Sequence, residues 1–337
     1  MAEEGVSVVI PARDCAGTLE RVIGALRPEL LDCDELIVVD DGSTDGTAEL
    51  AASLGAQVIR NTRRRGAAGA RNAGAERAAG SIILFVDSDA VVPEGWRRKL
   101  IGSLTEQGAD AVQAVYSPLA PGRSCSTFYK NYYYHYTFTR RIGSPWLTGC
   151  GTFFFAVRSE LFVRTGGFDE EVAGASIEDA DIAARIVAAG GRIWLEPGIE
   201  VYHLRVYDIP GLLLYDWRMV RAKTKYILRR RCRLHGASLS MARPRELLPV
   251  AIGAVSVWGI PAGAALLPMT GAIGAATSLS SLGLLLLSQA GFWTSMTRAG
   301  GLRRGLGACL VGVPDLLLML PSALCALLSF HLLGRKY

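Results

Sequence analysis

Residues 81–89 read SIILFVDSD, a run of β-branched and aromatic residues that ends in two aspartates. Such a run is typical of a buried strand, and the acids mark its carboxyl end. Two similar runs precede it, VSVVIP at residues 6–11 and ELIVV at residues 35–39. Segments with helical spacing lie between and after these runs, at residues 18–29, 44–54 and 67–79. This alternation predicts an α/β domain with a mostly parallel, Rossmann-like sheet and helices on both faces.

Polar residues follow each of the three runs: Arg13 the first, Asp41 the second, and Asp87 and Asp89 the third. Ligands of parallel sheets bind outside the carboxyl ends of the strands, so these residues should open onto one crevice. On an extended strand Asp87 and Asp89 would point the same way and could reach one Mg²⁺ or Mn²⁺ ion. Asp41 suits a ribose hydroxyl or a base N–H, and the alternative is turn and cap chemistry.

The composition of the 337-residue chain changes sharply along its length. Residues 1–206 mix charged and apolar residues as a soluble domain does. Residues 207–246 are basic, with apolar positions at helical spacing, which favours a helix lying on a membrane surface; packing on the domain is the alternative. Residues 247–337 form a predicted transmembrane region of about three helices, each long enough to cross ~30 Å of hydrocarbon: residues 247–269, 272–294 and about 312–333.

The charge pattern indicates membrane lipids rather than nucleic acid as a partner. The net charge of +5 is concentrated in one stretch that contains no acidic residue: Arg218, Arg221, Lys223, Lys225, Arg229, Arg230, Arg231, Arg233, Arg243 and Arg245. Beside apolar spans, such a run is typical of a membrane surface. The first residues do not resemble a signal peptide. The positive-inside rule therefore predicts a multi-pass protein of the inner (plasma) membrane with a cytoplasmic amino-terminal domain, and it leaves Arg335 and Lys336 outside as a mild violation.

Five segments resemble, in order and spacing, the motif series of family 2 glycosyltransferases. They cover about residues 5–205 and read VSVVIPARD, IVVDDGSTD, GAAGARNAGAERAAGSIILFVDSD, LTGCGTFFFAVRSELFVRTGGFDE and IEDADIAARI. The resemblance implies a GT-A fold, inversion at the anomeric carbon, a nucleoside diphosphate sugar as donor, and Mg²⁺ or Mn²⁺ as cofactor. One departure is Asp14, where the family usually has Asn; we expect this residue to cap the first turn of a helix.

By matching positions, the resemblance implies roles for the donor side of the site. The nucleoside would contact four residues: Pro11, Arg13, Asp41 and Arg71. Asp87 would lie near the donor sugar and ribose, and Asp89 would ligate the metal. His203 follows the last strand of the domain; in some relatives a histidine there touches the metal, and the alternative is a structural residue.

On the acceptor side, the resemblance assigns Asp179, and the remaining residues are assigned from their residue types. Asp179 takes the position of the catalytic base, at the start of a predicted helix that favours an ionised carboxylate. Four further residues are assigned to an acceptor or sugar pocket: Glu178, Gly149, Gly151 and Trp146. For Trp146 core packing is the alternative, and for Glu178 it is an acidic first helical turn.

The implied chemistry is a single displacement. An acceptor hydroxyl attacks the anomeric carbon, a carboxylate removes its proton, and a metal neutralises charge on the leaving diphosphate. We predict a lipid-linked or membrane-proximal hydroxyl acceptor, in the synthesis of a cell-envelope glycan or glycolipid. A polyprenyl phosphate acceptor, which needs no base, is one alternative. A non-catalytic membrane scaffold that keeps a degenerate transferase domain is another, and the intact acids speak against it.

Overall fold

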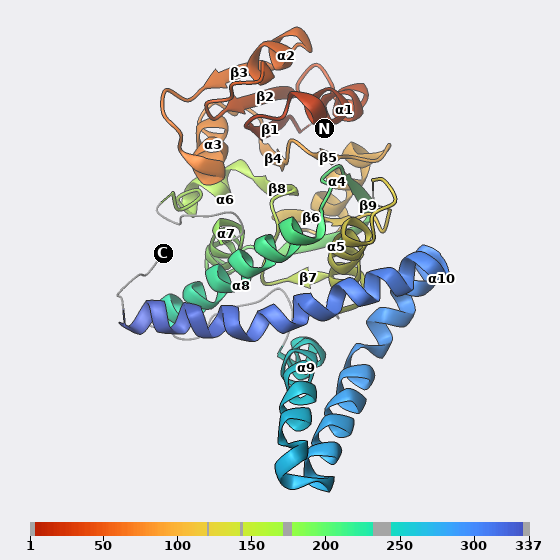
Figure 1. The fold of residues 1–337 in the computed structure, drawn as a ribbon. Coiled ribbons are helices and arrows are strands. Elements are labelled where there is room, and N and C mark those ends of the chain that lie inside the picture. The colour runs from red at the N-terminus through yellow and green to blue at the C-terminus, as the bar shows by residue number, and fades with distance from the viewer. Residues whose placement is uncertain (1–3, 120, 142–143, 171–176, 232–243, 333–337) are drawn as a thin grey trace. The chain divides into compact units, whose positions relative to one another are not determined.

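The computed structural model describes residues 4–119, 121–141, 144–170, 177–231 and 244–332, and its elements are labelled in Figure 1. The chain divides into two compact units. The first contains the described residues of 4–117 and 144–205, and the second those of 118–141 and 206–332. The boundary at 205 lies beside the predicted one at 206, but residues 118–141 belong with the helical unit instead of the α/β domain.

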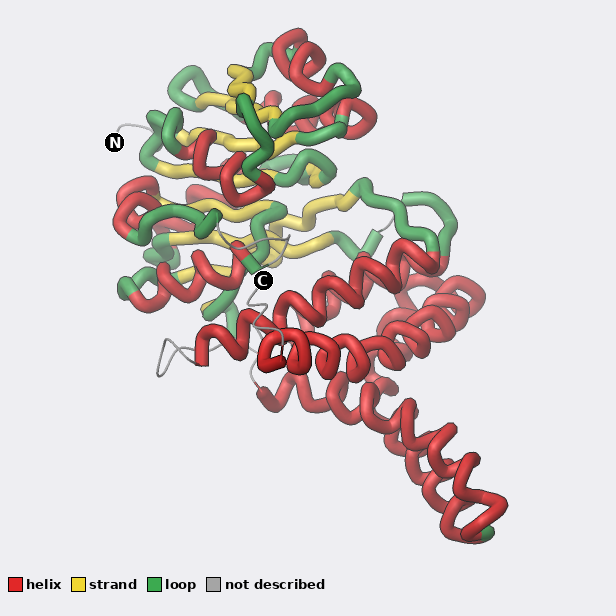
Figure 2. The backbone as a smooth tube through the Cα atoms, turned by 60° about the vertical axis from the view of Figure 1, so that its left-hand side comes forward, coloured by secondary structure: helices red, strands yellow, loops and turns green. Residues whose placement is uncertain are grey.

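The first unit is built on one mixed sheet with the strand order β3-β2-β1-β4-β8-β6-β9-β5, and β7 pairs with β9. Figure 2 shows the strands as yellow segments between helices. The strands are β1 (Val6–Ala12), β2 (Glu35–Asp40), β3 (Gln57–Arg60), β4 (Ile82–Val86), β5 (Ala90–Val91), β6 (Ala111–Tyr116), β7 (Trp146–Leu147), β8 (Phe154–Arg158) and β9 (Ile193–His203). The three apolar runs quoted above are β1, β2 and β4, and the side chains of their central residues are buried.

The strands that carry the predicted site residues are parallel. β1 pairs with β2 on one side and with β4 on the other, and Ala12 lies opposite Asp40. The amide of Asp41 donates to the carbonyl of Ala12 at 2.9 Å. The carboxyl ends of these strands therefore meet at one edge, as predicted. Beyond β4 the sheet is mixed, because β8 runs antiparallel to both β4 and β6.

Helices pack along this sheet. They are α1 (Ala16–Leu26), the 3-10 turn η1 (Arg27–Glu29), α2 (Thr47–Ser53), α3 (Gly66–Ala75), α4 (Trp96–Glu106), α6 (Ser159–Arg164) and α7 (Glu178–Ala188). α3 lies closest to the strands: a Cβ added to Gly74 would stand 2.3 Å from Cγ1 of Val9 and 3.1 Å from Cγ2 of Val39. The small residues of α3 thus allow its backbone, and with it Arg71, to approach the sheet closely.

The second unit is helical. It consists of α5 (Cys125–Tyr136), the π-helical turn η2 (Thr137–Arg141), α8 (Ile209–Arg231), α9 (Pro244–Thr270) and α10 (Ala272–Leu332). The aromatic side chains of α5 explain why it belongs here, because Phe128, Tyr129 and Tyr132 pack with Phe292 and Met296 of α10 in one buried cluster. Sequence spacing could not show this, since the partners lie more than 150 residues apart.

Among the residues that the structure describes, two helices are long and apolar enough to cross a membrane, at Leu248–Thr270 and Ala272–Leu332. The first predicted span corresponds to α9 and the second to the first half of α10. The third lies in the second half of α10, which a break at Gly301, with φ 74° and ψ 164°, separates from the first half as a helix of its own. The predictions for residues 232–243 and 333–337, including Arg233, Arg243, Arg335 and Lys336, fall outside the described residues.

Candidate active site

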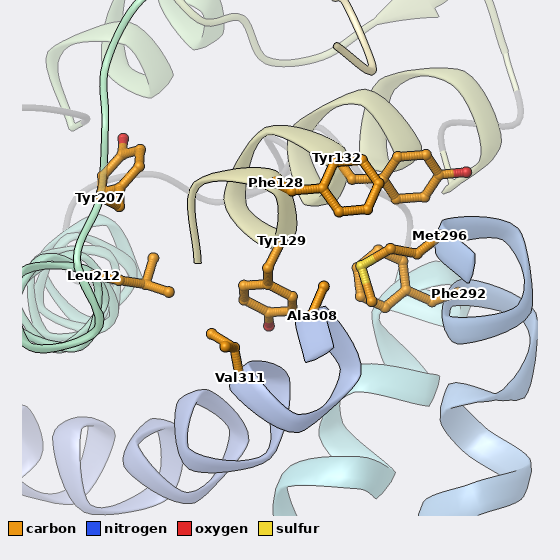
Figure 3. Packing of buried hydrophobic residues seen from close by; sticks show 9 residues of the cluster. All are labelled: Phe128, Tyr129, Tyr132, Tyr207, Leu212, Phe292, Met296, Ala308 and Val311. Carbon is orange, nitrogen blue, oxygen red and sulfur yellow. The ribbon is translucent and has the colours of Figure 1, made fainter. Parts of the chain in front are cut away.

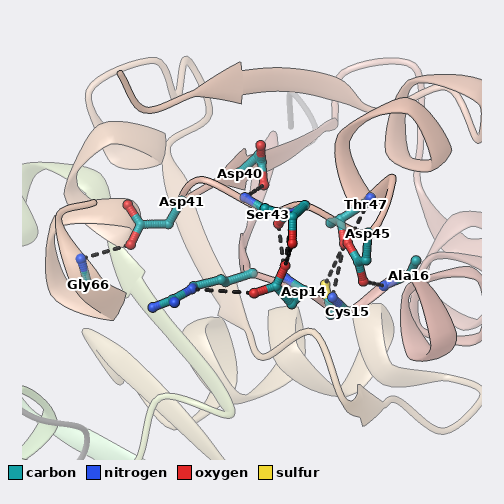
Figure 4. Close-up of polar contacts among 11 residues, drawn as sticks. Asp14, Cys15, Ala16, Asp40, Asp41, Ser43, Asp45, Thr47 and Gly66 are labelled. Atoms are coloured by element: carbon teal, nitrogen blue, oxygen red, sulfur yellow. Dashed lines mark hydrogen bonds and ion pairs between the residues drawn. The ribbon is translucent and has the colours of Figure 1, made fainter. Parts of the chain in front are cut away.

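Asp41 connects the end of β2 to the start of α3. Its carboxylate accepts hydrogen bonds from Nδ2 of Asn61 at 2.8 Å and from the amides of Arg65 and Gly66, each at 2.9 Å. Figure 4 shows the Asp41–Gly66 contact. The first amides of a helix lack partners within the helix, so a carboxylate placed there stabilises its start. These contacts are the cap chemistry that was the alternative for Asp41, and they fix where α3 begins.

Arg71 lies one and a half turns into α3 and is 4% exposed. Its guanidinium contacts Oδ1 of Asp87 at 2.7 Å and Oε1 of Glu178 at 3.2 Å. Burial disfavours its charge, but the charges of Asp87 and Glu178 outweigh burial and raise the pKa of Arg71. The structure therefore uses Arg71, assigned above to the nucleoside, to bring the end of β4 together with the start of α7. Among the described residues its Nε has no hydrogen-bond partner.

Asp87 and Asp89 lie in a turn at the end of β4 and contact different partners. The turn is closed by the amide of Ala90, which donates to the carbonyl of Asp87 at 3.0 Å. Asp87 binds Arg71, whereas Asp89 lies 3.4 Å from Nε2 of His203. That both carboxylates reach one cation stays a prediction, and the strand conformation on which it was based ends at Val86.

The Asp89–His203 contact follows from the pairing of β5 with β9. Ala90 lies opposite His203 in this antiparallel pair, which puts the residue before Ala90 beside the imidazole. Burial opposes the charge on Asp89, but the hydrogen bond and charge of His203 prevail and lower the pKa of the carboxyl group. The imidazole also packs against the ring of Tyr116, 5.1 Å between centroids.

A carboxylate and an imidazole at this separation fit a divalent cation that takes its remaining ligands from phosphate oxygens and water, as Mg²⁺ commonly does. Among the described residues there is no cluster of three or more His, Cys, Asp or Glu residues suited to a metal. The protein side of such a site would thus consist of Asp89 and His203.

Asp179 begins α7 next to Glu178. Its Oδ1 accepts a hydrogen bond from the amide of Ala180 at 2.7 Å, and Sγ of Cys150 lies 3.3 Å from its carbonyl oxygen. A Cβ added to Gly151 would lie 4.0 Å from Oδ2 of Asp179. The segment of Gly149 and Gly151, both buried, thus passes beside the predicted base. Burial, together with the negative charge of Asp179, raises the pKa of Cys150 well above its ordinary value, so this thiol stays protonated.

Glu178 is not the exposed first-turn acid that the sequence allowed as an alternative. Its side chain is 5% exposed and its Oε2 accepts from the amide of Ile177 at 3.1 Å. The pair with Arg71 accounts for this burial, because an isolated buried carboxylate would be costly. Asp181 does take an ordinary helical pair with Arg185 four residues on, at 2.7 Å.

Gln113 is a residue that the sequence reasoning missed. It lies on β6, is fully buried, and its Oε1 accepts from the amide of Gly151 at 2.7 Å while its Nε2 donates to the carbonyl of Ala114 at 3.0 Å. It therefore holds the Gly151 segment in place beside Asp179. The available signal was a lone polar residue inside the apolar run AVQAVY.

Trp146 lies apart from these residues. It begins β7, pairs with Trp194 at the start of β9, and stacks under the guanidinium of Arg192 at 3.8 Å. His203 ends the same β9. The nine residue steps from Trp194 to His203 would span up to about 30 Å in an extended strand. The contacts of Trp146 are those of the packing alternative.

Pro11 and Arg13 follow β1 to the same edge. Pro11 pairs with Val39, and the half-exposed side chain of Arg13 lies 3.6 Å from Asp14. Asp14 does not cap the first turn of α1 as expected. It adopts a left-handed φ of 47°, which Asp and Asn tolerate, and its Oδ1 accepts from the amide of Thr44 at 2.9 Å.

The capping contact at α1 comes instead from Asp45, whose Oδ2 accepts from the amide of Ala16 at 3.0 Å. Figure 4 shows how Asp14 and Asp45 tie the loop after β1 to the loop after β2. Asp14 thus connects the two loops by accepting a hydrogen bond. Asp and Asn both offer an oxygen acceptor, which explains why this chain can have Asp where the family usually has Asn.

Comparisons with known proteins agree with this geometry. Residues 7–165 match the family described as Glycosyl transferase family 2. The chain is 29% identical over 264 residues to the succinoglycan biosynthesis protein ExoA of Rhizobium meliloti, covering 74% of this chain and 76% of that protein. It is also 29% identical over 206 residues to the pre-mycofactocin glycosyltransferase of Mycobacterium tuberculosis, covering 59% of this chain but only 42% of that relative.

A solved structure shows the same fold. The mannosyltransferase PcManGT from Pyrobaculum calidifontis, in complex with GDP-Man and Mn²⁺, superposes with a TM-score of 0.61 at 23% identity and covers 90% of this chain and 86% of that one. This likeness shows the GT-A fold for the present chain.

Proposed function

Residues 7–165 match the Glycosyl transferase family 2 model, and from this premise we propose that the protein transfers a sugar, with inversion, from a nucleoside diphosphate sugar to a hydroxyl group of a lipid-linked or membrane-proximal acceptor. The observation that supports this reaction best is the Arg71 bridge. It joins Asp87, from the end of β4, to Glu178, the neighbour of Asp179. A donor-side acid and the candidate base are thus held at one edge of the sheet.

In the proposed reaction Asp179 accepts the proton of the attacking hydroxyl. Asp179 lies at the start of α7, and the amino terminus of a helix favours an ionised carboxylate. Asp89 and His203 would hold Mg²⁺ or Mn²⁺. When bound, such an ion neutralises charge on a departing diphosphate. The Mn²⁺ in the complex of the mannosyltransferase PcManGT supports the proposal of a divalent cation.

On the donor side we propose that Pro11, Arg13 and Asp41 border the nucleoside. All three lie at the carboxyl edge of β1 and β2, where ligands of parallel sheets bind. Arg13 is the one with an exposed side chain, so it is the residue best able to move onto a ligand. Asp41 would act with one remaining lone pair and through the start of α3 that it fixes.

The apolar helices support a location in the plasma membrane, with the first unit in the cytoplasm. The basic residues of α8 and the Arg298, Arg303 and Arg304 segment would then lie on the same, cytoplasmic side, as the positive-inside rule requires. Sugar transfer near the membrane surface follows from that placement.

The rate of sugar transfer by the Asp179→Asn variant tests the proposal. Purified wild-type and variant protein would be given uridine, guanosine and thymidine diphosphate sugars, with and without Mn²⁺, and released nucleoside diphosphate measured. We expect the variant to lose about 10²–10⁴-fold in transfer to a hydroxyl acceptor, the usual value of general base catalysis. Asp181→Asn, two residues along α7, is the matched control and should keep its activity.

Two results would contradict this reading in different ways. Wild-type rates in Asp179→Asn would remove the base and favour an acceptor that is already an anion, such as a polyprenyl phosphate. No turnover of any donor by the wild-type protein would favour a scaffold. Asp89→Asn should reduce turnover and the response to Mn²⁺ together, whereas an unchanged Mn²⁺ response would exclude Asp89 as a ligand.

A further inference from the structure

The second half of α10, residues 302–332, carries its polar groups on the side that packs against protein. Asp315, Ser322 and Ser329 are buried. The Tyr129 hydroxyl donates to Oδ2 of Asp315 at 2.7 Å, and Oγ of Ser322 donates to the carbonyl of Trp217 at 2.6 Å. Seven of its leucines lie on other positions and are between 37% and 74% exposed: Leu302, Leu306, Leu310, Leu320, Leu324, Leu328 and Leu332. We call these seven side chains the leucine row.

This half-helix lies along α5 and α8 over most of its length. Its contacts start with Arg304, which donates to the carbonyl of Gly122 at 3.1 Å and stacks on Phe128. They continue through Ala308 and Val311, which pack in the cluster drawn in Figure 3, and reach Ser322. From residue 304 to residue 322 an α-helix rises about 27 Å. A helix that crossed the membrane away from α5 and α8 could not keep contact with them over that distance.

α5 and α8 cannot themselves lie in hydrocarbon. Arg218 and Lys223 on α8 are exposed. Between the two helices Lys130 forms a buried ion pair with Asp216. Burial disfavours the charged lysine, but Asp216 outweighs burial and raises its pKa. Charged, exposed side chains beside a membrane belong to its interfacial region, where lysine and arginine meet anionic headgroups. The half-helix that packs along α8 must lie at the same depth.

The neighbouring hairpin, formed by α9 and the first half of α10, indicates what covers the leucine row. Those helices meet through small residues: Oγ of Ser278 donates to the carbonyl of Ile260 at 2.8 Å, and a Cβ on Gly263 would clash with Ser278. Such close packing is typical of membrane helices. The half-helix joins this hairpin, since Nε1 of Trp258 donates to the carbonyl of Leu317 at 3.0 Å.

We propose that residues 302–332 do not span the bilayer but lie flat in its surface, with the leucine row in the acyl chains of an anionic membrane and α8 on the headgroup side. Only the hairpin inserts. Leu332 then lies on the same side of the membrane as the first unit, whereas three spans would place it on the opposite side. The proposal rests on the cytoplasmic location of the first unit proposed above, and it would remove the violation that the sequence places at Arg335 and Lys336.

Reporter fusions to the full chain test the side on which it ends. Green fluorescent protein and alkaline phosphatase would each be placed after residue 337 and expressed in a Gram-negative host, with a fluorescent protein before residue 1 as the cytoplasmic reference. We expect fluorescence equal to that of the reference and phosphatase activity at background. Phosphatase activity with loss of fluorescence would overturn the proposal, as would recovery of the chain in the soluble fraction.

A smaller perturbation covers the case in which a fusion disturbs the protein. His331 is exposed and is not part of the leucine row, so His331→Cys offers a thiol at the end of the helix. A membrane-impermeant maleimide should label it in inverted vesicles and not above the wild-type background in spheroplasts. Labelling from outside, or from neither side, would overturn the proposal. Neither readout depends on sugar transfer, so a failure here and a failure of the proposed reaction are distinguishable.

Discussion

Replacing Arg71 by methionine should unfold the first unit more readily than any exposed substitution does. Arg71 is 4% exposed, and it is the cation that faces Glu178, itself 5% exposed. Methionine fills a similar volume but leaves Glu178 with the hydrogen bond from the amide of Ile177 and without its cation. Asp87, at 33% exposure, can turn to water and suffers less.

The size of the effect follows from that geometry. Removing one partner of a buried ion pair leaves a charge uncompensated and costs about 3–5 kcal/mol. For a folding unit of this size each kcal/mol lowers the melting temperature by about 2–4 °C, so Arg71→Met should melt roughly 6–20 °C below wild type. If the cost arises from the stranded carboxylate, Glu178→Gln added to Arg71→Met should recover most of it, because a neutral pair no longer requires the cation.

Thermal unfolding followed by circular dichroism would compare wild type, both single variants and the double variant at pH 7. Arg77→Met, exposed near the end of α3, is the control and should stay within about 0.5 kcal/mol of wild type. The reasoning is refuted if Arg71→Met melts with the control, or if the double variant is no more stable than Arg71→Met. Arg71→Lys keeps the charge but loses the two-pronged guanidinium, so its melting temperature should lie between those of wild type and Arg71→Met.

Two further predictions concern stability. Asp34 is held by Arg97 at 2.7 Å; burial opposes its charge, yet the Arg97 hydrogen bond and two backbone amides lower its pKa. The ionised Asp34 therefore stabilises the fold above the unfolded-state pKa of about 3.9, and this stabilisation is lost as pH falls through the folded-state pKa. The difference in stability between wild type and Asp34→Asn, roughly 1.5–3 kcal/mol at pH 7, should therefore disappear on acidification. A difference in melting temperature that stays constant between pH 7 and pH 2 would contradict this. Gly74→Ala places a Cβ 2.3 Å from Val9 and should destabilise the protein by about 1–3 kcal/mol. Gly24→Ala, on α1, places a Cβ with no atom within 4 Å and should stabilise the protein by about 0.5–1 kcal/mol. If a denaturant titration shows that both variants change the free energy of unfolding in the same direction, the close approach of α3 to the sheet is ruled out.

The parts of the fold that the sequence predicts are those encoded locally. β1, β2 and β4 are apolar runs of strand length, and the parallel pairing that brings their ends together follows from the helices between them. The direction of β8 could not be predicted in this way. An apolar run reads the same whether the strand is parallel or antiparallel, and its neighbours β4 and β6 are distant in sequence.

The candidate site divides along the same line. The residue types of the site could be predicted from the sequence, because acidic residues at the ends of strands are a local pattern. Their partners were not, since Arg71 and Glu178 are 107 residues apart and Asp89 meets His203 only through the β5–β9 pair. The third predicted span shows the same limit: hydropathy counts apolar residues, but whether Asp315 and Ser322 face protein or lipid depends on α5 and α8.

The reversed direction of β8 decides which stretch of chain can shape the pocket next to β4. Had β8 run parallel, the residues after it would reach the ligand edge. Because it runs the other way, the stretch before it arrives there, and Phe153 reaches the amide of Asp87 at 3.2 Å. In the proposed reaction, the residues before the five-residue strand β8 would therefore border the sugar, whereas the residues after it continue into helix α6.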